Sequence, residues 1–158
     1  MTAARPRPAE APRPLGEMEQ QYYERALLAC LLSDPASTLK AVKEAGLRRS
    51  DVSAALAAVI DAVRDILGAG EPVTVEALAS TLRIRRAEAP ADFGGWHSFL
   101  TSAGLSDHDP GRWARALRAR VLRRRLPAAA QAVAERYPGS LDRLAALVEE
   151  LKALGGAS

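Results

Sequence analysis

The stretch DPGRWARALRARVLRRRL, residues 109–126, decides the fold, because it predicts a long helix with one apolar face and one cationic face. Its opening Asp109-Pro110 is typical of a helix start, since aspartate caps the first turn and proline is tolerated at the first helical position. Large apolar residues then recur at helical spacing and predict a stripe that packs against another helix. The stripe consists of Trp113, Leu117 and Val121, flanked by Leu122 and Leu126.

Seven arginines occupy the rest of this helix, with no acidic residue among them, and we expect them on its surface. Three interpretations are open: a solvated face on a packing helix, a surface for a protein partner, or a direct contact with nucleic acid. Apart from Trp113, which the stripe already uses, no aromatic side chain is interleaved as a stacking platform for bases. The pattern therefore favours packing and protein contact, with DNA contact weak or indirect. The arginines are Arg112, Arg115, Arg118, Arg120, Arg123, Arg124 and Arg125.

A second amphipathic helix follows the turn at Pro138-Gly139, and we expect Ser140 to cap it. Pro127 should kink or restart the first helix, because proline cannot donate to the preceding turn. The two helices predict a hairpin over residues 106–154, followed by a tail at 155–158. The inward positions of the second arm are Leu141, Leu144, Leu147, Val148 and Leu151.

Residues 17–105 predict a compact helical subdomain, and no strand pattern is found, so the expected fold class is all-α. Residues 1–16 hold four prolines among alanine and arginine, and we expect a disordered arm there. Helices are expected at about 17–32, from Pro35 to Gly46 after a cap at Asp34, at 51–67 after a cap at Ser50, at 75–83 after a cap at Thr74, and after Gly94-Gly95. Gly46 suits the left-handed conformation that ends a helix.

The composition fits one domain with a core of packed helices, because alanine and leucine dominate and aromatic residues are scarce. A formal net charge of +3 is too small to argue for nucleic acid by itself. Cys30 is the only cysteine, which excludes a disulfide within the chain and fits a reducing compartment. With no secretory signal and no membrane-spanning run, we expect a cytoplasmic protein that does not contact membranes.

Catalysis is not expected from this sequence. The phosphate-binding pattern GxxxxGK[ST] is absent. His97 and His108 have no third ligand at helical spacing, and Cys30 lies among leucines, where a thiol is usually inert. We therefore expect no enzyme activity, no cofactor and no metal site.

Four motifs in succession resemble the N-terminal domain of DnaB-type bacterial replicative helicases. ERALLACLLSDPAS (residues 24–37) resembles the motif of that domain's first helix, and GAGEPVTVEALASTL (68–82) is similar to a second motif. GGWHSFL (94–100) and WARALRARVLRRRL (113–126) resemble a third and a fourth. No single motif is specific, but their order and spacing are shared over residues 24–126.

The sequence departs from the family pattern in two ways: in residues of the core and in the ATPase domain that drives a helicase. Ala29 stands where the family has glycine, Pro127 where it has an aliphatic residue, and SDVSAALAAVID (50–61) lacks the family's core aromatics. The 158 residues contain no RecA-type ATPase domain. The resemblance therefore implies the ring-forming collar of a helicase without its motor, either as a separate chain or as a fragment of a longer helicase.

In that family the helical hairpins pair, the domains form a ring, and the ring docks primase. The resemblance thus implies a non-catalytic oligomerisation and docking domain of the replication machinery, a homo-oligomer (dimer or ring) whose partners are the replicative helicase, primase or both. Two alternatives stay open: the helicase-binding domain of a primase, and a DNA-binding protein that uses its arginine helix. The candidate interface residues are Trp113, Leu117, Val121, Leu144, Leu147, Leu151, Arg115, Arg118 and Arg123.

Overall fold

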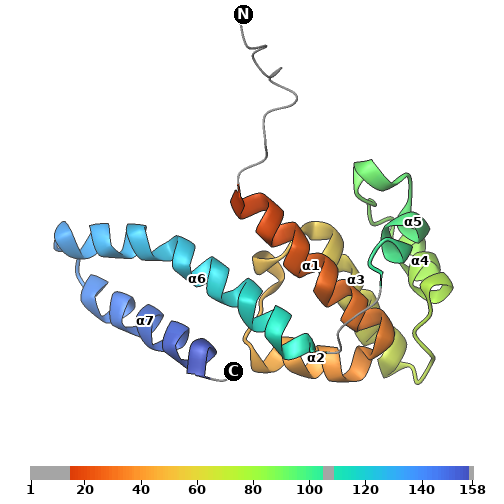
Figure 1. The fold of residues 1–158 in the computed structure, drawn as a ribbon, viewed down its shortest axis with the longest axis horizontal. Coiled ribbons are helices and arrows are strands. Elements are labelled where there is room, and N and C mark those ends of the chain that lie inside the picture. Colours follow the sequence, from red (N-terminus) through yellow and green to blue (C-terminus); the bar gives the residue numbers. More distant parts are fainter. Residues whose placement is uncertain (1–14, 105–108, 157–158) are drawn as a thin grey trace, which may run out of the picture.

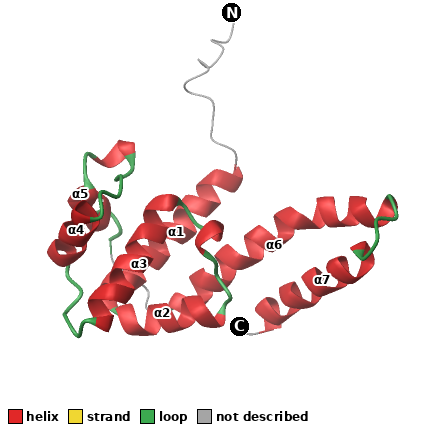
Figure 2. Ribbon diagram, turned by 180° about the vertical axis from the view of Figure 1, so that it is seen from behind, coloured by secondary structure: helices red, strands yellow, loops and turns green. Residues whose placement is uncertain are grey.

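The computed structural model describes residues 15–104 and 109–156, which form seven α-helices and two short 3-10 turns with no strand among them (Figures 1 and 2). The predicted all-α class is confirmed. The α-helices are α1 (Leu15–Ser33), α2 (Pro35–Glu44), α3 (Ala54–Gly68), α4 (Val75–Ile84), α5 (Trp96–Thr101), α6 (Pro110–Ala134) and α7 (Ser140–Gly156). The 3-10 turns are η2 (Arg49–Asp51) and η3 (Ala91–Phe93).

Three of the five predicted helix caps are present. The side chains of Asp34, Thr74 and Asp109 each accept a hydrogen bond from the backbone N–H three residues later, at 3.3, 3.0 and 3.2 Å. Such a bond satisfies one of the N–H groups that a helix start leaves unpaired. Gly46 adopts the predicted left-handed conformation after α2, with φ of 69°.

The cap predicted at Ser50 is wrong, because residues 49–51 are taken up by η2 and α3 begins later. Ser53 caps α3 instead, its hydroxyl accepting from the N–H of Leu56 at 3.3 Å. Glu24 of α1 fixes that choice: its Oε1 accepts from the Ser53 N–H at 3.1 Å and from the Ser53 hydroxyl at 2.5 Å. The first helix thereby sets where the third one starts.

The core lies between α1, α3 and the first half of α6. Leu27 and Leu31 of α1 are fully buried, as are Val59 and Val63 of α3. From α6, Leu117 enters the same core and is also fully buried. The long helix α6 therefore belongs to the globular part over its first turns and leaves it only afterwards.

Beyond the core, α6 continues away from the other helices and pairs with α7, which runs back antiparallel to it (Figure 1). The predicted restart at Pro127 does not occur, since α6 runs through it to Ala134. Pro127 and Arg123 are both exposed. Water can therefore solvate the Arg123 carbonyl that loses its helical partner.

The start of α7 differs from the prediction in two details. Ser140 is the first residue of α7 rather than the cap before it, and it is buried. Leu141 comes 100° further around the helix and is 66% exposed, so its predicted inward position is wrong. The other four predicted inward residues of α7 are half-buried: Leu144, Leu147, Val148 and Leu151.

None of the described helices combines the length and the apolar character that a membrane span needs.

Truncating Leu117 tests whether the first half of α6 belongs to the core. We expect Leu117→Ala to lower the free energy of unfolding by about 2–5 kcal/mol, because it opens a cavity at a fully buried site. Leu141→Ala is the matched control and should change it by less than about 0.5 kcal/mol, since that side chain is mostly exposed. Urea unfolding followed by circular dichroism measures both, and equal losses would contradict the assignment.

Candidate functional site

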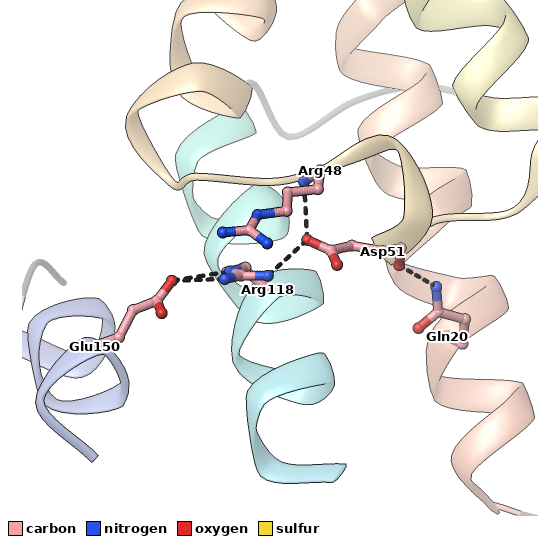
Figure 3. Close-up of polar contacts among 5 residues, drawn as sticks. All are labelled: Gln20, Arg48, Asp51, Arg118 and Glu150. Atoms are coloured by element: carbon pink, nitrogen blue, oxygen red, sulfur yellow. Dashed lines mark hydrogen bonds and ion pairs between the residues drawn. The ribbon is translucent and has the colours of Figure 1, made fainter. Parts of the chain in front are cut away.

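A buried arginine on α6 joins three elements of the fold (Figure 3). The side chain of Arg118 is only 2% exposed. Its Nη1 donates to Oδ2 of Asp51 in η2 at 3.0 Å. Its Nε and Nη2 donate to Oε1 of Glu150 in α7 at 3.0 and 2.8 Å. One guanidinium group therefore ties the globular part to the second arm of the hairpin, and we call these three residues the Arg118 triad.

The two carboxylates of the triad sit in different surroundings. Asp51 has no exposed side-chain surface, whereas the side chain of Glu150 is 42% exposed. The turn positions Asp51 locally: its Oδ2 also accepts from the Arg48 N–H at 2.8 Å, and its carbonyl accepts from the Gln20 side chain at 3.4 Å. Its other oxygen, Oδ1, is buried without a hydrogen-bond partner.

The charge on Arg118 is maintained in this environment. Burial lowers the pKa of Arg118, but the hydrogen bond to Glu150 and the negative charge of Asp51 outweigh that effect and leave the pKa above its ordinary value. A permanently charged guanidinium with a planar fork of donors suits two carboxylates on different sides. The triad is therefore a fixed ionic contact.

The surface position predicted for Arg118 is wrong. Helical periodicity places it off the apolar stripe, which by itself indicates solvent. The side chain is buried because η2 and α7 cover that side of α6 and bring a carboxylate each. Nothing near Asp51 or Glu150 in the sequence signals a buried arginine partner.

Arg120 is a second arginine that was predicted to lie on the surface but is mostly buried in the structure. Its side chain is 10% exposed and lies against α1, where its Nε donates to Gln20 Oε1 at 2.8 Å. Its Nη1 is 3.6 Å from Oε2 of Glu19, and its buried Nη2 has no hydrogen-bond partner. Two of the seven arginines of α6 therefore hold the helix to other parts of the chain.

An aromatic cluster forms where α1 crosses α6. The ring of Trp113 lies 5.6 Å from that of Tyr22 and 5.9 Å from that of Tyr23, between centroids. The Arg112 guanidinium lies over Trp113, 4.7 Å from the ring centroid. The Tyr23 hydroxyl donates to Glu19 at 2.8 Å; this bond, with burial, raises the pKa of Tyr23. No pattern in the sequence indicates this cluster, because α1 supplies both tyrosines from far along the chain.

The structure divides the predicted interface residues into three groups. Trp113, Leu117 and Arg118 are buried within the chain itself. The second group lies along the two arms of the hairpin and is half-buried. The third group is Arg123, which is exposed. The half-buried residues are Val121, Leu144, Leu147, Leu151 and Arg115.

The residues considered for catalysis that the structure describes differ in burial. His97 is exposed on α5, Cys30 is buried in the core, and His108 lies outside the described residues. Within residues 15–104 and 109–156, no three histidine, cysteine, aspartate or glutamate side chains gather as a metal site.

Comparison with known proteins finds similarity among solved structures. No family model and no curated protein matches the chain. The fold is similar to the crystal structure of the N-terminal domain of DnaB helicase from Mycobacterium tuberculosis, with a TM-score of 0.58 and 25% sequence identity. The match covers 82% of this chain and 96% of that chain. The resemblance found in the sequence is thus confirmed in the structure, and it supports a domain associated with a replicative helicase.

Because the two carboxylates are unequally buried, we expect their removal to lower the free energy of unfolding by unequal amounts. Asp51→Ala should lower the free energy of unfolding by about 3–5 kcal/mol, because it leaves a buried guanidinium without its buried partner. Glu150→Gln should cost about 1 kcal/mol or less, since water screens a half-exposed pair. Chemical denaturation measures both.

A double variant separates the triad from the local role of Asp51 in its turn. If the cost of Asp51→Ala comes from the orphaned charge, Arg118→Met should cost much less in the Asp51→Ala background than in the parent. Strictly additive losses of stability would show that Arg118 and Asp51 do not depend on one another.

Proposed function

We propose that this domain is a non-catalytic oligomerisation and docking domain of the DNA replication machinery, acting beside or within a replicative helicase. The observation that carries the proposal is the hairpin. It extends from the globular part, with α7 packed on one side only (Figure 1). The similarity to the N-terminal domain of DnaB helicase supports the same reading.

The apolar side chains of α7 are incompletely covered within one chain. Leu144, Leu147 and Leu151 recur at helical spacing and remain half-buried. Each square ångström of apolar surface removed from water contributes about 25 cal/mol, so a row of half-exposed leucines favours association. A second copy of the hairpin carries the same row, and a two-fold arrangement covers both rows at once.

Two of the predicted interface arginines on α6 are not buried within the chain. Arg123 is exposed and Arg115 half-buried. Charges at the rim of an interface select partners and orient them more than they add affinity. We therefore assign Arg115 and Arg123 to the rim of the interface, and we remove Trp113, Leu117 and Arg118 from it because they are buried in the chain.

The partners we propose are a further copy of the chain, a replicative helicase and primase. A helicase-binding domain of a primase is the weaker candidate, because the solved structure that resembles this chain is named as a helicase domain. We assign no catalytic step to the domain, since its sequence has no phosphate-binding loop.

A charge placed in the apolar row tests the proposed assembly. We expect the parent to form a dimer or a larger oligomer at micromolar concentration, and Leu147→Asp to raise the dissociation constant at least about tenfold, because the interface would bury an unpaired carboxylate. Sedimentation velocity over a concentration series measures the shift.

Ile84→Asp is the matched control, since Ile84 is an exposed aliphatic residue of the globular part. It should leave the oligomeric state unchanged. A parent that stays strictly monomeric up to about a hundred micromolar, or an equal effect of both variants, contradicts an interface on the hairpin.

A further inference from the structure

We propose that the aromatic cluster at the crossing of α1 and α6 binds single-stranded nucleic acid, with a base stacked on Tyr22 and phosphates paired with Arg112 and Arg123. The site shares Arg123 with the proposed rim of the hairpin interface, but binding at the aromatic cluster does not depend on the proposed function. It rests on three observations: an exposed ring held in place, two exposed guanidinium groups that form no ion pair within residues 15–104 and 109–156, and a hollow that borders the ring and Arg112.

The ring of Tyr22 is exposed and held in position. It is 62% exposed, yet it makes edge-on contacts with both Trp113 and Tyr23, at 5.6 and 5.9 Å between ring centroids. Met18, one turn earlier on α1, is also mostly exposed. A tyrosine fixed by two neighbouring rings loses little freedom when a base stacks on it, and such stacking is tolerant of sequence.

The cations beside this ring are not neutralised within the described residues. Arg112 and Arg123 are exposed, and neither forms an ion pair with a carboxylate of residues 15–104 or 109–156. Both lie near enough to the Tyr23 hydroxyl to lower its pKa, although the hydrogen bond to Glu19 raises that pKa more. Glu19, the nearest acid, is itself paired with Arg120.

The spacing of the two arginines suits one extended strand. Eleven residues separate Arg112 from Arg123, which places them on nearly the same face of α6 and about 16 Å apart along its axis. A shallow hollow of about 660 Å³ borders Arg112, and its lining residues are Met18, Glu19, Tyr22, Tyr23, Arg112, Trp113 and Ala116. We place one unpaired base in this hollow beside Arg112, with a phosphate further along the same strand at Arg123.

A nucleic-acid duplex or an acidic peptide would contact only part of this site. A duplex keeps its bases stacked on one another, so it would use the arginines and leave the Tyr22 ring idle. An acidic peptide likewise needs the charges and not an aromatic face. Single-stranded nucleic acid is the ligand that uses the ring and both cations together.

The test is a titration of the full chain into a labelled oligothymidylate of about ten nucleotides, followed by fluorescence anisotropy. We expect a dissociation constant of about 10⁻⁴ to 10⁻⁶ M at physiological salt. Tyr22→Ala should weaken binding at least about fivefold, the lower end of the effect of one stacked base, while Tyr22→Phe should keep it. The double variant Arg112→Gln, Arg123→Gln should lower the slope of log affinity against log salt by about 1.4, since each phosphate contact in a single strand contributes about 0.7.

The hairpin tip and α7 offer matched controls. Tyr137→Ala and Arg143→Gln remove an exposed tyrosine and an exposed arginine away from the cluster, and both should bind as the parent does. Circular dichroism confirms that each variant is folded. Unchanged binding by Tyr22→Ala, an equal loss in the controls, or a duplex of the same length that binds as well as the single strand overturns the proposal. Displacement of the oligonucleotide by polyglutamate with equal potency in the parent and in Tyr22→Ala identifies an acidic-protein site and also overturns it.

Discussion

The ion pairs of Arg118 constrain the rest of this fold. Moving a guanidinium group out of water costs several kcal/mol unless carboxylates replace the lost hydration. Here those carboxylates come from η2 and α7, which both contact α6. The position of the turn η2 is constrained by this cation, because a shift of the turn leaves a buried charge without its buried partner, whereas the half-exposed pair with Glu150 adds a weaker contact to α7.

The helix α6 has two structural roles along its length. Its first turns supply Trp113 and Leu117 to the core, and its later turns leave the core and carry α7. The arginines differ in burial: Arg118 and Arg120 hold α6 to other parts of the chain, Arg115 is half-buried, and the four remaining arginines are exposed. A run that looks uniform in the sequence thus contains structural cations and surface cations, and only the second kind is available to a partner.

The hairpin and the aromatic cluster differ in what they leave uncovered. Along α7, a row of aliphatic side chains is half-buried, and such a surface is best completed by a similar surface. At the crossing of α1 and α6, an exposed ring lies among cations, and such a surface suits a ligand that has both a flat face and negative charge. The two surfaces are chemically distinct, and Arg123 is the one residue assigned to both.

The sequence by itself determined the features that depend on neighbours along the chain. The caps at Asp34, Thr74 and Asp109 were predictable because each bond spans three residues, and the helical class followed from periodicity. The order of four motifs indicated the relationship that the solved structure bears out. Tertiary structure alone decided the rest. Ser53 became the cap through a glutamate on another helix, Arg118 became buried through two distant carboxylates, and Tyr22 met Trp113 because α1 crosses α6. In each case the stabilising contact is made by a residue far along the chain. Periodicity and local propensity do not encode such a contact.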